Sequence, residues 1–63
     1  MDKGKIKKTL ADARHAIGHA YAFIGVERYV SAQLEIDRAR KDLQLVDDAL
    51  DESLRQALNQ QTT

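Results

Sequence analysis

Apolar and small residues recur along the chain at intervals of three and four, in two separate series. The first series is made of Ile6, Leu10, Ala13, Ile17, Ala20 and Ile24. The second series is made of Tyr29, Ala32, Ile36, Ala39, Leu43, Val46, Leu50 and Ala57. This spacing is typical of one face of an α-helix. Because the first series does not continue in phase into the second, the pattern predicts two helices with a break near Gly25.

Two helices joined by a short connection pack as antiparallel neighbours. The pattern therefore predicts an all-α fold, a single antiparallel helical hairpin that uses the whole chain of 63 residues. We expect a first helix over about 5–24, a turn over about 25–29 and a second helix over about 30–58, with frayed tails.

Several residues could mark the helix ends. Asp2 is a candidate N-cap, and Thr9 followed by Asp12 is an alternative start for the first helix. Gly25 suits the left-handed position that follows many helices. The second helix then begins at once, or at Ser31 used as a cap.

Folding the chain about the turn places Ile17 beside Ile36 and Leu10 beside Leu43, with alanine pairs between these layers. The end of the second helix extends past the first, so its leucines have no partner in the hairpin. A chain this short buries a small core, and it has no cysteine with which to reinforce that core. We therefore expect self-association into a four-helix bundle, most simply a dimer. The expected interface residues are Leu10, Ile17, Ile36, Leu43, Leu50 and Leu54.

The charge balance narrows the range of partners. Ten basic and ten acidic residues give a formal net charge of zero, which argues against bulk nucleic acid or an anionic membrane as the partner. The longest uncharged apolar stretch, 20–26, is too short to span a bilayer. The basic start of the chain is followed by further charged residues, unlike a signal peptide. We expect a cytoplasmic protein with no membrane contact.

Lysines crowd the start of the first predicted helix, and acids crowd 47–52 near the end of the second. In an antiparallel hairpin these clusters lie at the same end, so the lysines are expected to face the acids. An alternative function for the basic residues is a nucleic-acid contact formed on a dimer. The residues that would make it are Lys3, Lys5, Lys7, Lys8 and Arg14.

His15 and His19 share a helix face at a spacing that suits two metal ligands. The sequence offers no cysteine and no accompanying His-Glu-x-x-His pattern, so we interpret both as surface residues and expect no cofactor. The alternative is a weak metal site, or one shared between subunits, at these two histidines. No serine, histidine and acid arrangement and no glycine-rich phosphate loop is recognisable, and we do not expect an enzyme.

Three aromatic residues, Tyr21, Phe23 and Tyr29, lie close to the predicted turn. They either close the end of the core or form a small recognition patch there. The sequence leaves both alternatives open.

The run Ile17-Gly18-x-x-Tyr21-x-x-x-Gly25, followed by Tyr29-x-x-Ala32-x-x-x-Ile36-x-x-Ala39, resembles a tetratricopeptide repeat. The resemblance covers roughly residues 14–40, and Arg14 stands in the place of the family's usual aromatic residue. A lone repeat cannot bury both of its faces. The resemblance therefore implies a repeat-like hairpin that binds protein.

Together these features predict a small, non-enzymatic helical interaction protein: a homo-oligomeric adaptor, regulator or assembly factor that binds another macromolecule. The alternative is a regulator that binds nucleic acid through the lysine-rich surface of a dimer. Salt distinguishes the two functions, because nucleic-acid binding weakens steeply as salt rises while an apolar interface does not.

Overall fold

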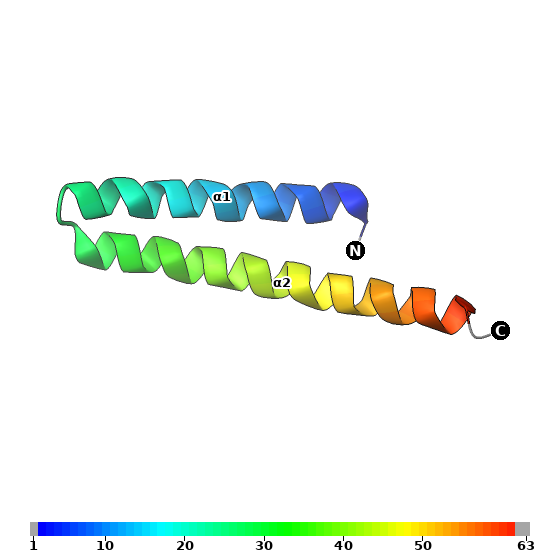
Figure 1. The fold of residues 1–63 in the computed structure, drawn as a ribbon. Coiled ribbons are helices and arrows are strands. Elements are labelled where there is room, and N and C mark those ends of the chain that lie inside the picture. The colour runs from blue at the N-terminus through cyan, green and yellow to red at the C-terminus, as the bar shows by residue number, and fades with distance from the viewer. Residues whose placement is uncertain (1, 62–63) are drawn as a thin grey trace.

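The computed structural model describes the backbone of residues 2–61 and the side chains of residues 2–59. The described chain forms two helices, α1 (Lys3–Gly25) and α2 (Tyr29–Gln61), with no strand. They run antiparallel and pack along the full length of α1 (Figure 1). The predicted all-α hairpin is therefore confirmed. Of the tail that was expected to fray, residues 62–63 lie outside the described chain.

The start of α1 is fixed by Asp2. This residue has an extended backbone, and its Oδ1 accepts a hydrogen bond of 2.8 Å from the backbone N–H of Lys5. The bond satisfies one of the free N–H groups of the first turn. Thr9 does not begin a helix, because its hydroxyl donates to the carbonyl of Lys5 at 2.9 Å in the middle of a helical turn.

The turn between the helices is a Schellman motif. The backbone N–H of Arg28 donates to the carbonyl of Phe23 at 2.9 Å, and that of Glu27 donates to the carbonyl of Ile24 at 3.1 Å. In this motif the residue just past the helix adopts the left-handed conformation. That residue is Glu27, with φ 61°, whereas Gly25 is the last residue of α1 and has no positive φ. The prediction that Gly25 supplies the left-handed position is thus wrong by two residues.

The second helix begins directly after this turn. The backbone N–H of Ala32 donates to the carbonyl of Arg28 at 3.0 Å, which is the first bond of the helical ladder. Arg28 is therefore the flanking residue of α2, and Ser31 lies within the helix. Of the two alternatives left open by the sequence, the helix restarts at once.

The two helices meet through small residues, which we call the alanine seam. Its six buried members are Ala13, Ala16, Ala20, Ala32, Ala39 and Val46. Alanine at successive contact positions lets two helix backbones approach closely. The contact therefore runs through the small residues of the pattern.

The pattern predicts that its large residues form core layers inside the hairpin. In the structure they do not form such layers. Ile17 and Ile36 are 48% and 40% exposed, and Leu10 and Leu43 are exposed to a similar extent. They lie beside the alanine seam and not within it. The seven-residue repeat of large residues thus remains uncovered in the single hairpin.

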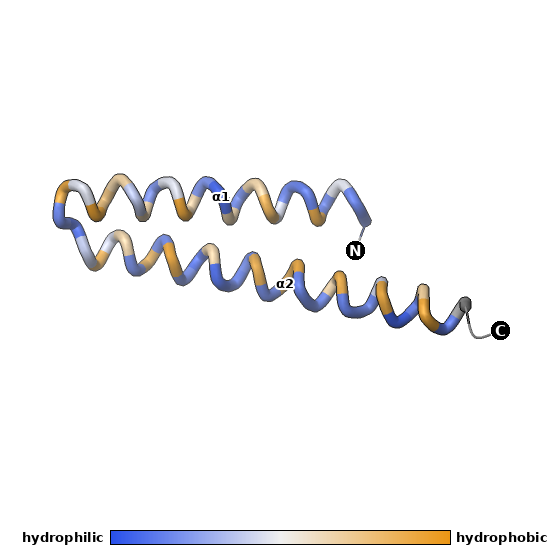
Figure 2. Tube along the Cα trace, in the orientation of Figure 1, coloured by the Kyte–Doolittle hydropathy of each residue, from blue (hydrophilic) through white to orange (hydrophobic). Residues whose placement is uncertain are grey.

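The hairpin is long and thin, with extents of 56 × 17 × 12 Å. Beyond the N-terminal end of α1, α2 continues alone (Figure 1). We call residues 50–59, near and beyond that end, the overhang; all of them are exposed. Figure 2 shows that apolar positions recur along α2 into the overhang. Neither helix, over the residues that the structure describes, holds a segment both long and apolar enough to cross a membrane.

Candidate interaction surface

One side of the hairpin carries a continuous set of exposed large apolar residues, which we call the apolar face. On α1 its members recur every seven residues at Leu10, Ile17 and Ile24, a spacing that keeps them on one side of a helix. On α2 the same repeat gives Ile36, Leu43 and Leu50, followed by Leu54. All six residues predicted as an oligomer interface belong to this face and are exposed in the single hairpin.

Near the turn the apolar face is hollowed into a groove of about 510 Å³ between the two helices. The α1 wall is made by Ile17, Tyr21 and Ile24, and the α2 wall by Tyr29 and Ile36. The floor and rim are Ala20, Ala32 and Gln33. The lining shows that the large residues of the two helices lie on the same side of the alanine seam.

The aromatic residues near the turn divide between the two alternatives. Phe23 is half-buried, as expected for a residue that closes the end of the core. Tyr21 is 84% exposed and Tyr29 is 60% exposed, and both line the groove. The sequence analysis did not predict the groove. The seven-residue spacings from Ile17 to Ile24 and from Tyr29 to Ile36 could have indicated it, because they place the wall residues on one side of each helix.

The opposite side of the hairpin is polar. Its residues surround a shallow depression lined by Asp12, His15, Ala16, His19, Glu35, Arg38 and Asp42. Glu35 Oε2 lies 3.6 Å from His19 Nδ1, and Glu35 Oε1 lies 3.4 Å from Arg38 Nη1. The His19–Glu35 contact, which is an ion pair only when the imidazole is protonated, is the one contact of this kind between α1 and α2 among the described residues. The hairpin therefore has one apolar and one polar side.

His15 and His19 are both exposed on this polar side. Within the described residues no group of three or more histidine, cysteine, aspartate or glutamate side chains is placed to hold a metal ion. His19 is directed toward Glu35, which in turn contacts Arg38. The two histidines are thus not joined by a third ligand in the described part of the hairpin.

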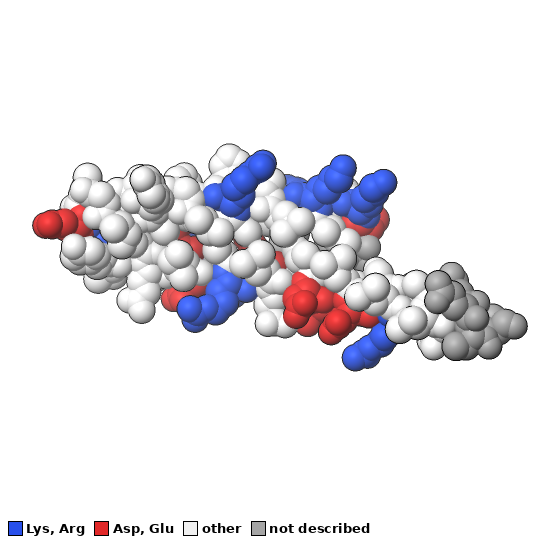
Figure 3. Space-filling model, viewed as in Figure 1, with Lys and Arg blue, Asp and Glu red and all other residues white. Residues whose placement is uncertain are grey.

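The basic residues near the start of α1 are exposed and make none of the three ion pairs between described residues. In Figure 3 most of the blue groups in view lie along the outer edge of α1, while a red cluster lies on the outer edge of α2, with blue groups on either side of it. The lysines and the 47–52 acids therefore do not pair at contact distance, contrary to the expectation. Lys7 and Arg14 flank Leu10 and border the apolar face.

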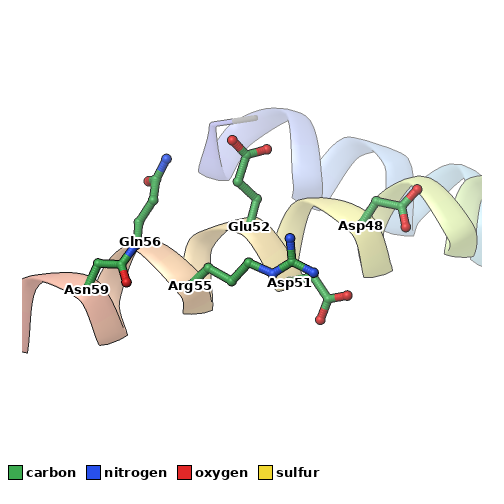
Figure 4. Close-up of a pocket in the computed structure, with 6 residues that line it drawn as sticks. All are labelled: Asp48, Asp51, Glu52, Arg55, Gln56 and Asn59. Carbon is green, nitrogen blue, oxygen red and sulfur yellow. The ribbon is translucent and has the colours of Figure 1, made fainter.

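A second cluster of polar residues lies on the last turns of α2. Its members are Asp48, Asp51, Glu52, Arg55, Gln56 and Asn59. All come from one helix, and Figure 4 shows that Glu52 and Gln56 point to one side of it while Arg55 extends along it toward Asp51. This arrangement fits the solvent-facing side of a helix.

The feature of the hairpin best suited to binding is therefore its apolar face, with the groove at one end and the overhang at the other. Large contiguous apolar patches are uncommon on the surface of monomers and mark sites of association. Comparison of the chain with protein-family models, with curated proteins and with solved structures gives no match.

Proposed function

We propose that this chain is a non-enzymatic helical interaction protein that self-associates through its apolar face. The simplest assembly is a dimeric four-helix bundle whose polar outer side binds another macromolecule, as an adaptor, regulator or assembly factor. We place it in the cytoplasm, as expected from the sequence. The observation that carries the proposal is the exposure of Leu10, Ile17, Ile36 and Leu43 along one side of the hairpin.

The total surface area of the chain supports this proposal. A compact monomer of 7.1 kDa exposes about 4,100 Å². This chain exposes 5406 Å². The excess of about 1,300 Å² falls within the range of about 1,000–2,500 Å² that each subunit contributes to an obligate dimer interface. One further copy of the hairpin is therefore enough to cover it.

The composition of the alanine seam supports it as well. Burial of an apolar side chain stabilises a fold in proportion to the area that is removed from water. Ala13, Ala16, Ala20, Ala32 and Ala39 are small, and Val46 is the largest buried side chain in the described chain. Small domains with small cores are usually reinforced by oligomerisation when they lack disulfides and metals. The leucines and isoleucines of the apolar face would supply that reinforcement.

The proposal can be tested with a matched pair of leucine variants. Leu43 and Leu45 are 45% and 53% exposed, but only Leu43 belongs to the apolar face. We expect the wild-type chain and Leu45→Asp to have the mass of a dimer by light scattering over a concentration series. Leu43→Asp should be monomeric and should lose helical circular dichroism, because a charge in the interface would be buried without a partner.

Two results would contradict self-association. A wild-type chain that stays a folded monomer at the highest concentrations would show that the apolar face is not covered by a second copy. Equal masses for Leu43→Asp and Leu45→Asp would show that association uses another surface.

The alternative function, nucleic-acid binding, is favoured by one observation. Lys3, Lys7 and Arg14 lie on the same side of α1 at steps of four and seven residues, and none of them forms an ion pair with a described residue. Lys5 and Lys8 would contact nucleic acid from the other side of the helix. This function requires affinity for RNA or DNA that falls steeply with salt and that is lost in Lys7→Gln and Arg14→Gln variants. Binding that does not change with salt would exclude it.

A further inference from the structure

We propose that the two copies pack with opposite directions, so that the overhang of each copy lies in the groove of its partner. This inference rests on the self-association proposed above and adds its geometry. It assigns the groove a specific occupant, the apolar side of residues 50–58 from a second copy of the chain.

The groove and the overhang are the two parts of the apolar face that one hairpin leaves most open. The groove has two walls, one from each helix, and its only polar side chain apart from the tyrosine hydroxyls is Gln33. The overhang carries Leu50, Leu54 and Leu58, which are 47%, 62% and 61% exposed. The end of α2 extends past α1 (Figure 1). When the overhang of one copy lies in the groove of the other, three helices contact one another: α1 and α2 of one copy and α2 of its partner.

The register of α2 supports opposite directions. When two α2 helices cross antiparallel at Leu43, Ile36 lies opposite the partner's Leu50, and Tyr29 lies opposite the partner's Ala57. The largest residue of the repeat then meets one of the smallest, as close packing requires. The same register places Arg40 next to the partner's Asp47.

The lengths also agree. Leu43 is 16 residues from Glu27 in the turn and 16 residues from Asn59 in the overhang. The overhang of one copy therefore ends close to the level of the partner's turn. The groove spans Ile17 to Ile24, about 10 Å of helix, which the overhang of about 15 Å covers fully.

Packing in the same direction is the competing arrangement. It would bring Lys3 and Lys7 close to the partner's Asp47 and Asp51, but it would leave both overhangs beyond the bundle and would place the two grooves face to face. Exposed ion pairs contribute much less to association than burial of several leucines. The apolar surface therefore decides in favour of opposite directions.

The absence of cysteine allows a direct distance measurement. A nitroxide label on Val26→Cys, at the exposed turn, should give a distance between the two copies of about 50 Å by pulsed electron paramagnetic resonance. Packing in the same direction would give less than about 25 Å and would overturn the inference while leaving the dimer intact. A labelled chain with the mass of a monomer and no dipolar coupling would overturn the proposed function itself.

The tyrosines provide a second, independent readout. The chain contains two tyrosines and no tryptophan, and both tyrosines line the groove. In the dimer, acrylamide should quench tyrosine fluorescence less than it does in a Leu54→Ser, Leu58→Ser variant, whose overhang lacks the residues that would cover the groove. A Leu34→Ser, Leu45→Ser variant, changed at leucines outside the apolar face, should behave like the wild type. Equal quenching in all three dimers would show that the overhang does not occupy the groove.

Discussion

Glu27 holds the conformation that helix ends usually give to glycine. Its φ of 61° places a side chain in the left-handed region, which costs a non-glycine residue roughly 1 kcal/mol. We expect Glu27→Gly to raise the free energy of unfolding by about 0.5–1 kcal/mol, measured by thermal unfolding at constant protein concentration. Glu27→Ala removes the same side chain but keeps the unfavourable conformation. An equal gain in both variants would mean that the φ angle is not the cause.

Gly18 lies in the interior of α1, where glycine lowers helix stability. A Cβ built at this position meets no atom within 4 Å, so α2 does not approach the helix there. Gly18→Ala should therefore stabilise the protein by about 0.8–1 kcal/mol in chemical unfolding. Gly25→Ala, at the last position of the helix, is the matched control and should gain less. A loss of stability at Gly18 would indicate that a second chain contacts this position.

At the scale of the helices, the periodicity was sufficient to predict two antiparallel helices and the position of the break. It could not predict the left-handed residue, because Gly25 and Glu27 both lie within the break and the hydrogen bonds decide between them. It also could not predict whether the alanines or the large residues of each apolar series face the other helix of the hairpin. Alanines and large residues alternate along the same stripe, and the closest approach of the backbones selects the alanines.

The alanine seam gives a direct test of this packing. Ala39 is 3% exposed between the helices, so Ala39→Leu should force them apart and cost about 1–3 kcal/mol of stability. Ala22→Leu makes the same chemical change at an exposed position of α1 and should be nearly neutral. Urea unfolding of both variants measures the difference. A neutral Ala39→Leu would mean that the helices are not held at the distance set by alanine.

At the scale of the molecule, spacing and the unequal lengths of the helices predict Leu10, Ile17 and Leu54 as interface residues. The structure shows that these side chains are exposed, and association through them stays a prediction. The groove requires the relative rotation of two helices, which a one-dimensional pattern does not contain. The resemblance to a tetratricopeptide repeat, and the protein partner it implies, stay predictions.

The proposed dimer makes thermal stability depend on concentration. Since association stabilises the folded state by mass action, the melting temperature should rise steadily as the protein concentration is raised 100-fold. The Leu45→Asp variant should show the same dependence, whereas Leu43→Asp, which is expected to lose its helical circular dichroism, should show no cooperative melting transition at any of these concentrations. A wild-type melting temperature that is independent of concentration would place the stabilising contacts within the single hairpin.

A core built of alanine has a consequence for the abundance of the protein in a cell. Because the seam alone buries little area, a chain of the proposed dimer that has not met its partner would be only marginally folded and open to proteolysis. At low copy number most chains would be removed before they pair, and above a threshold the paired fraction would persist. The level at which the chain is synthesised would then act as the switch that determines whether any working assembly exists.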